Sequence, residues 1–191
     1  MEEMRHLTLE ELEVGLEEIC RAPKDDGTVE LIVRRPDFGE REVLTEGTLD
    51  LVEGVVGDNW RTRGSSTTSD NSANPEMQLN VMNARSIAVI AQEKGRWALA
   101  GDQLYLDMDL SKENLPPGQR LAVGSAVIEV TPLPHTGCKK FVARFGVDAV
   151  KFVNSPEGKS LRLRGLNAKV VQPGVVKVGD KVRKVQNPAD E

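Results

Sequence analysis

The second half of the chain is a succession of short apolar runs separated by Gly, Pro and Asp residues. Runs of this length, rich in Val, Leu and Ile and bounded by turn-forming residues, are typical of β-strands. They follow one another too closely to leave room for long helices, which favours a β-barrel or sandwich over a parallel sheet flanked by helices. We therefore predict a mainly β fold, a mostly antiparallel and closed or nearly closed barrel from Val29 to Val185. The strand-like runs are 104–110, 120–124, 126–130, 168–171 and 181–185.

The N-terminal segment 7–21 has the pattern of an amphipathic helix. Its apolar residues recur three or four positions apart, and Thr8 followed by Glu11 forms a capping-box pattern. Pro23 ends the segment, and we interpret Cys20 within it as a packing residue. A second short helix is predicted near 85–92. The apolar residues of the first helix are Leu9, Leu12, Leu16 and Ile19.

Two strands are predicted at 28–34 and 40–45, and a polar tract follows at 57–74. A tract this rich in Ser, Thr, Asn and Asp cannot bury enough apolar surface to order itself, so we predict a long loop that is either mobile or functional. Arg61 and Arg63, with the glycine and hydroxyl residues around them, can cradle an oxyanion. Arginines in such runs more often only face solvent.

The charge balance limits the classes of partner. The chain has 25 Lys and Arg against 30 Asp and Glu, a net charge of −5, which argues against a nucleic-acid-binding surface. No stretch is long and apolar enough for a membrane span, and the start MEEM is acidic where a secretory signal is basic. We therefore expect a cytoplasmic protein whose two cysteines are free thiols.

Cys138 is the candidate reactive residue. It lies three residues after His135 and directly before Lys139 and Lys140, surroundings that favour the thiolate, which is the form that attacks sulfur or binds soft metals. The Pro- and Gly-containing segment around it is typical of a loop, where functional sites concentrate. The alternative is that Cys138 is a small buried apolar residue, as most free cysteines are.

A zinc site is a weaker alternative for the same segment. His135 and Cys138 supply two ligands, whereas a structural zinc site needs four. The remaining histidine and cysteine, His6 and Cys20, lie in or beside the distant N-terminal helix. Their distance in the sequence does not favour a shared site.

Several separated motifs make the chain resemble a MOSC domain, the family named after the C-terminal domain of molybdenum cofactor sulfurase. The resemblance spans Val29 to Val185, and it is firmest from Asn83 onward. It depends on the order of the motifs around one cysteine. These are Asn83-Ala84-Arg85, Gly101-Asp102-Gln103-Leu104, Leu121-Ala122-Val123-Gly124-Ser125-Ala126, Cys138-Lys139-Lys140-Phe141, Arg144-Phe145-Gly146, Leu163-Arg164-Gly165-Leu166-Asn167-Ala168 and the run 174–182.

The resemblance implies a strongly bent, mostly antiparallel β-barrel with a few short helices. We expect an N-terminal helical extension at 1–27, the MOSC-like barrel domain at 28–186 and a disordered tail at 187–191. The family's recurrent cysteine is its proposed sulfur carrier, and Cys138 matches it. The resemblance therefore implies carriage of sulfur as a persulfide, or binding of the molybdenum cofactor (molybdopterin) with Cys138 as the metal ligand. An anion-binding or partner-binding module with a structural cysteine is the alternative.

Partners and cofactors follow from the same resemblance. A sulfur carrier needs a sulfur donor such as a cysteine desulfurase, and a cofactor-binding protein can serve a molybdoenzyme. Pyridoxal phosphate is not expected, because in the sulfurase it belongs to a separate domain for which this chain has no room. Nucleic acid and membrane are not expected as partners.

We predict a site formed by Cys138 and His135 with a rim of polar and basic residues, because an anionic pterin phosphate needs cationic or amide donors. Two structural alternatives remain open for the rim: Arg144 can pair with Asp148, four residues on, and Arg164 can lie on a solvated strand face. The predicted rim consists of Arg85, Lys139, Arg144, Arg164 and Asn167.

Overall fold

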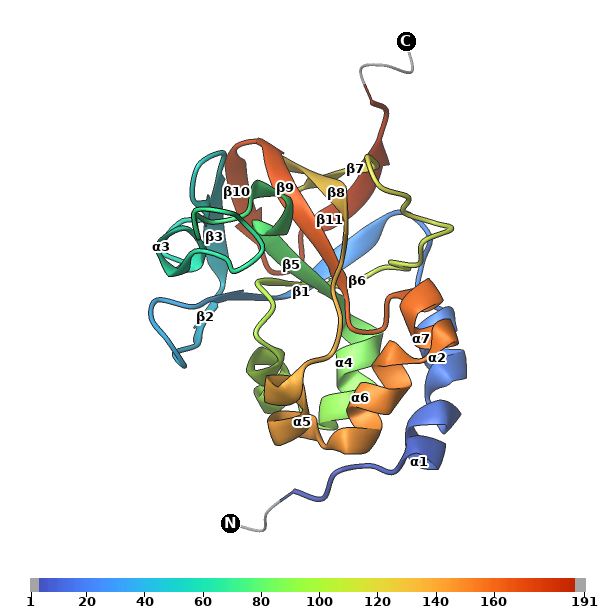
Figure 1. Cartoon of the computed structure of the whole chain (residues 1–191). Coiled ribbons are helices and arrows are strands. Elements are labelled where there is room, and N and C mark those ends of the chain that lie inside the picture. Colours follow the sequence, from blue (N-terminus) through green and yellow to red (C-terminus); the bar gives the residue numbers. More distant parts are fainter. Residues whose placement is uncertain (1–3, 188–191) are drawn as a thin grey trace.

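A closed barrel of seven strands forms the centre of the computed structural model, which describes residues 4–187 (Figure 1). The strands follow the order β11-β7-β8-β9-β5-β6-β1, and pairing of Gly27 in β1 with Val182 in β11 closes the ring. Among the described strands of the barrel, only β5 and β6 pair in parallel. The prediction of a mostly antiparallel barrel is confirmed. The strands are β1 (Gly27–Arg34), β5 (Leu79–Asn83), β6 (Leu104–Asp107), β7 (Arg120–Val123), β8 (Ala126–Pro134), β9 (Leu166–Gln172) and β11 (Lys181–Val185).

The barrel closes because alternate residues of its strands are apolar and point inward. In β7, Leu121 and Val123 are fully buried and the residues between and before them are half-buried. Successive side chains of a strand point to opposite faces, so this period of two gives each strand one core face. The inward-facing residues Ile32, Leu79, Val81, Leu104, Leu106, Leu121, Val123, Ile128, Val130 and Ala168 belong to one continuous core.

A smaller sheet and a hairpin extend from one side of the barrel (Figure 1). The sheet consists of β10 (Gly174–Lys177), β3 (Glu46–Asp50) and β4 (Gly54–Val55), and β2 (Glu42–Leu44) pairs with β1 to form the hairpin. The polar tract at 57–74 contains a short helix, α3 (Trp60–Arg63), before a stretch without helix or strand at 64–74. A 3-10 turn, η1 (Pro75–Met77), leads into β5.

The helices other than α3 pack together below the barrel around a second core (Figure 1). The predicted N-terminal helix consists of two pieces, which meet at Gly15. A Cβ atom at Gly15 would lie 2.6 Å from Val89 Cγ1, so the small residue allows the close approach to α4. Cys20 is exposed, so its interpretation as a packing residue was wrong. The elements are α1 (Leu9–Val14), α2 (Leu16–Cys20), α4 (Ala84–Ala91) and the 3-10 helix η2 (Lys94–Ala100).

Three helices that the sequence analysis did not predict lie between β8 and β9. They are α5 (Lys139–Phe145), α6 (Val147–Asn154) and α7 (Pro156–Leu161). Phe141, Phe145, Ala149, Phe152 and Val153 recur at helical spacing and are all buried in the second core. The helical spacing of these apolar residues is the signal in the sequence that indicates helices in this segment.

The structure describes only part of the three segments that we expected from the sequence. The extension expected at 1–27 includes residues 1–3, and the tail expected at 187–191 includes 188–191. These seven residues lie outside the described part of the chain. Within residues 4–187, no helix has the length and apolar character needed to cross a membrane.

Candidate functional site

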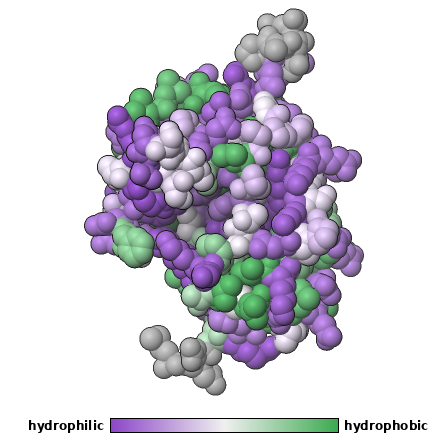
Figure 2. All heavy atoms as spheres, viewed as in Figure 1, coloured by the Kyte–Doolittle hydropathy of each residue, from purple (hydrophilic) through white to green (hydrophobic). Residues whose placement is uncertain are grey.

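A cavity of about 350 Å³ opens between the β1–β2 hairpin, helix α5 and the turn that follows η2. Figure 2 shows a hollow on this face of the molecule, bordered mostly by hydrophilic residues. Six of the lining residues are cationic, and Asp37 is the acidic one. We call this site the cationic cavity. Its cationic residues are Arg35, Arg41, Arg63, Lys140, Arg144 and Arg164.

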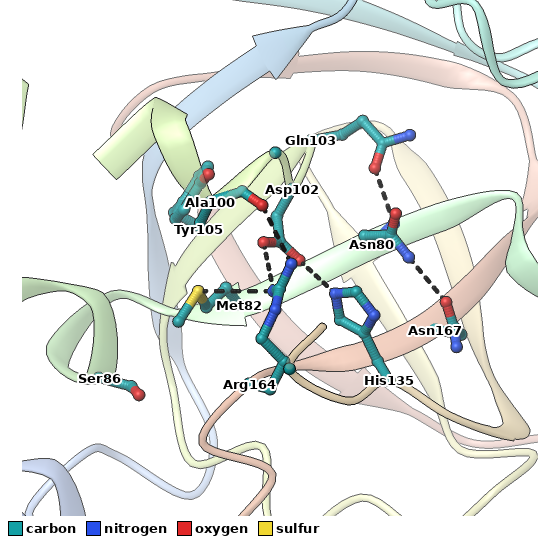
Figure 3. A network of polar contacts seen from close by, with 12 residues as sticks. Asn80, Met82, Ser86, Ala100, Asp102, Gln103, Tyr105, His135, Arg164 and Asn167 are labelled. Atoms are coloured by element: carbon teal, nitrogen blue, oxygen red, sulfur yellow. Dashed lines mark hydrogen bonds and ion pairs between the residues drawn. The ribbon is translucent and has the colours of Figure 1, made fainter. Parts of the chain in front are cut away.

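A buried ion-pair network forms the inner wall of the cationic cavity (Figure 3). Asp102, in the turn between η2 and β6, accepts a hydrogen bond of 2.6 Å from Arg164 Nη1 and one of 2.9 Å from His135 Nε2. Arg164 also donates to the Ala100 carbonyl at 3.0 Å, and its guanidinium lies 4.8 Å from the ring centroid of Phe141. Three separate segments of the chain therefore meet at one carboxylate.

The charges within this network follow from burial and proximity. Burial by itself raises the pKa of Asp102, but the charge of Arg164 and the contact with His135 outweigh it, so the pKa lies below its usual value. The pKa of His135 is lowered, chiefly by burial and next by the positive charge of Arg164. The network thus holds an ionised Asp102 beside a neutral His135. Since the carboxylate can only accept, His135 Nε2 carries the proton and Nδ1 keeps its lone pair.

This arrangement predicts a loss of stability in mild acid. An unfolded histidine gains a proton below a pH of about 6.5, whereas the lowered pKa keeps folded His135 neutral. The unfolded state is therefore favoured as the pH falls from 7 to 5, by at most about 1.4 kcal/mol per pH unit. Denaturant unfolding across this range should show a smaller loss for His135→Gln, which cannot titrate. Equal losses in the two proteins would contradict the assignment.

A second buried ion pair holds the hairpin against the barrel. Arg35 donates to both carboxylate oxygens of Asp58, at 2.9 and 2.8 Å, and to the Gly101 carbonyl at 3.1 Å. Beside it, Asn80 Nδ2 donates to Asn167 Oδ1 at 2.7 Å (Figure 3). These contacts fix the segments that line the cationic cavity before any ligand arrives.

Arg41 and Arg63 face the same cavity without acidic partners among the described residues. Burial, and next the charges of Arg144 and Arg35, lower the pKa of Arg41. Burial and the charges of Arg35 and Arg41 lower the pKa of Arg63. Arg41 Nε is buried with no hydrogen-bond acceptor in the described part of the chain. Arg41 is half-buried and Arg63 lies exposed at the edge of the cavity, and crowded arginines of this kind are stabilised by an anion.

Cys138 lies at the mouth of the cationic cavity, directly before helix α5. The thiol is exposed, so the alternative that Cys138 is a buried packing residue was wrong. Partial burial raises its pKa, but the amides of Phe141 and Lys140 and the charges of Arg164 and Lys140 together leave the pKa below its ordinary value. The geometry therefore presents an accessible thiol that ionises readily.

The two cysteines should differ in reactivity. Burial and the charges of Glu157 and Asp109 raise the pKa of Cys20, the opposite direction from Cys138. Both thiols are exposed, so access does not separate them. We expect iodoacetamide to label Cys138 several times faster than Cys20 near pH 7, because the thiolate is the reactive form. Peptide mass spectrometry over a series of pH values measures both rates, and faster labelling of Cys20 would contradict the prediction.

The structure brings some of the predicted site residues together and not others. Cys138, His135, Arg144 and Arg164 line the cationic cavity, and Arg144 donates to the Leu99 carbonyl at 2.7 Å. Arg144 does not pair with Asp148, whose partner is Lys151. Arg164 is buried, so it does not lie on a solvated strand face.

The remaining predicted residues lie behind the cavity or away from it. Asn167 is buried behind the wall, where it contacts Asn80 and the Leu133 carbonyl. Arg85 pairs instead with Asp107 at 2.7 Å and Glu18 at 3.1 Å, and neither Arg85 nor Lys139 lines the cavity. Within residues 4–187, no group of three or more His, Cys, Asp or Glu side chains is placed to hold a metal ion.

Sequence reasoning missed most of the cationic side chains. Asp102 stands in one of the quoted motifs, but its pairing with His135 and Arg164 was not predicted. Arg35 and Arg41 come from the hairpin at the start of the barrel, far from Cys138 in the sequence. Outside the predicted rim, Lys140 has a signal because it stands beside Cys138, and Arg63 has one because it stands in the polar tract that can cradle an oxyanion.

Comparison with known proteins gives the family. The family model of the MOSC domain matches residues 68–183. A search of curated proteins found no match.

Among solved structures, YuaD from Bacillus subtilis matches with a TM-score of 0.61 and 15% identity over 84% of this chain and 97% of its own. YiiM from Escherichia coli matches with a TM-score of 0.54 and 18% identity over 84% of this chain and 70% of its own. At these identities the solved structures show the fold alone. The family model covers more than half of the sequence and includes Asp102, His135, Cys138 and Arg164, and the chain belongs to the MOSC family.

Proposed function

We propose that this chain binds a molybdenum cofactor in the cationic cavity, with Cys138 as a ligand to the metal. The observation that carries the proposal is the combination of two crowded arginines without acidic partners and an accessible, readily ionised thiol on the same cavity. A phosphate-bearing, metal-containing ligand satisfies both features at once. A neutral substrate would satisfy neither.

The residues present fit such a group. Arg41 and Arg63 would hold the phosphate, because the unpartnered Nε of Arg41 already lacks the acceptor that a phosphate oxygen provides. Cys138 would offer its thiolate, the form in which cysteine binds metals. When bound, the molybdenum supplies redox chemistry that side chains cannot perform. Burial and the charge of Arg164 keep His135 neutral, and its hydrogen bond to Asp102 fixes the ring in the wall of the cavity that Cys138 also lines.

Sulfur carriage is the second candidate, and the exposure and lowered pKa of Cys138 favour it. The Cys138 thiolate would attack the outer sulfur of a persulfide on a donor such as a cysteine desulfurase. The sulfur–sulfur bond of the donor breaks, the donor cysteine leaves as a thiolate, and Cys138 becomes a persulfide. This candidate leaves the two unpaired arginines without a role, which is why we place cofactor binding first.

One purification tests both candidates. The untagged protein is produced in a host that makes the cofactor, and its molybdenum, pterin fluorescence and intact mass are measured beside those of Cys138→Ser. Stoichiometric pterin and molybdenum that Cys138→Ser loses or holds more weakly would support cofactor binding. Additional mass of about 32 Da on Cys138 after incubation with a desulfurase and cysteine, without pterin, would support sulfur carriage. A protein with neither would be an anion-binding module, and the proposal would fail.

A further inference from the structure

A second cavity, of about 410 Å³, lies on the other side of the wall formed by His135 and Arg164. Both residues line both cavities, so the buried Asp102 network separates them. The volume falls within the range of about 300–1,000 Å³ that is usual for small-molecule sites. Nothing in the proposed function requires this second cavity.

The walls of the second cavity are largely apolar. Val153 and Leu166 are buried at its base, and a segment of β8 forms one side. Gly165 also lines it, with a φ of +116°, and a Cβ atom there would lie 2.3 Å from the Val81 carbonyl oxygen and 3.2 Å from His135 Cδ2. A glycine at this position therefore leaves the imidazole edge uncovered on this side. The β8 residues of the wall are Pro132, Leu133 and Pro134.

The charged residues of the second cavity are all cationic. They are Lys112, Lys159, Arg162 and Arg164, and no Asp or Glu lines it. Among the described residues, neither of the lysines nor Arg162 has a carboxylate within ion-pair distance. Arg162 is held in place by donating to the Leu110 and Leu115 carbonyls, in a left-handed backbone conformation with a φ of 52°. Two arginines held by hydrogen bonds and two lysines without ion-pair partners among the described residues thus surround an apolar pocket.

We propose that the second cavity binds a small organic anion with a flat apolar body, such as an aromatic carboxylate. The apolar walls take the body of the ligand, and Lys112, Lys159 and Arg162 pair with its carboxylate. The ligand lies against the face of the His135–Arg164 wall opposite to Cys138. The two cavities share His135 and Arg164, but Arg41, Arg63 and Cys138, on which the molybdenum proposal depends, do not line the second cavity.

The test uses 2-naphthoate as the probe, with neutral 2-naphthamide as a ligand of the same shape. Isothermal titration calorimetry should show that the carboxylate binds about tenfold or more tightly than the amide, because charge-assisted hydrogen bonds replace neutral ones. The double variant Lys112→Gln/Lys159→Gln should remove most of that difference. The matched control Lys94→Gln/Lys151→Gln, which makes the same charge change at exposed lysines outside the cavity, should bind like the unaltered protein.

Two further variants locate the bound probe. Thr136→Trp places a bulky side chain at the exposed edge of the second cavity and should abolish binding of 2-naphthoate. Arg41→Gln/Arg63→Gln changes the cationic cavity only, so binding of 2-naphthoate should be unaltered. Equal affinities for carboxylate and amide, full binding by Lys112→Gln/Lys159→Gln, or loss of binding in Arg41→Gln/Arg63→Gln would each overturn the proposal. Loss of cofactor in Cys138→Ser has no bearing on it, so the two proposals fail separately.

Discussion

Replacing Asp102 with alanine should lower the free energy of unfolding by about 3–5 kcal/mol, the usual cost of breaking a buried ion pair by removing one partner. Asp102 is fully buried and is the carboxylate that Arg164 and His135 share. Its removal leaves the Arg164 guanidinium buried without a counter-charge and His135 without an acceptor. Urea unfolding followed by circular dichroism measures the loss.

Two variants make this result specific. Asp102→Asn keeps an acceptor but removes the charge, so its loss should be smaller than that of the alanine variant. Glu46→Ala breaks an exposed ion pair with Lys177, and such pairs contribute less than about 1 kcal/mol. A loss at Asp102→Ala as small as that at Glu46→Ala would show that Arg164 finds other partners, and the account of the wall would be wrong.

The double variant Arg41→Gln/Arg63→Gln should weaken binding of the cofactor by about 100-fold or more, since each arginine offers a charge-assisted hydrogen bond to a phosphate. The same change should leave the stability of the ligand-free protein unaltered or raise it. The reason is that burial and the charges of neighbouring arginines already lower the pKa of both side chains, so their charges oppose folding. Cofactor retention and thermal unfolding of the same sample measure the two effects.

The matched control for this pair is Arg5→Gln/Arg21→Gln. Both of these arginines form exposed ion pairs outside the cationic cavity, so the same change of charge should leave cofactor retention unaltered. A clear loss of stability in Arg41→Gln/Arg63→Gln would indicate that the two arginines are structural. In that case the two arginines would not serve as an anion site.

The barrel was predictable from the sequence because its signal is local. Each short apolar run between turn residues is sufficient to mark a strand, and their close spacing excludes a parallel sheet covered by helices. Helices α5 and α6 have a local signal too, since Phe141, Phe145 and Phe152 recur at helical spacing. The break at Gly15 was not predictable, because it depends on how closely α4 approaches.

Only the part of the site that is local in the sequence could be predicted. Cys138 and His135 stand three residues apart, so their proximity is visible in the sequence. The cations opposite them come from the β1–β2 hairpin and the polar tract, and they reach the cavity only when the barrel is closed. Arg85 illustrates the reverse case: it stands in a family-like motif, yet it pairs with Asp107 and Glu18 away from the cavity.

The pairing of β1 with β11, which closes the barrel, determines when the barrel can form during synthesis on the ribosome. Asp26 and Arg183, which bond beside this pairing, are 157 residues apart. During synthesis, strand β1 can pair early with β2 and β6, but its first residues wait for almost the whole chain before their partner β11 exists. Contacts this distant in sequence slow folding and expose nascent strand edges to aggregation. A ribosome-bound chain that ends before Lys181 should consequently hold an open sheet, protease-sensitive at β1, in which the hairpin arginines are not yet fixed opposite Cys138.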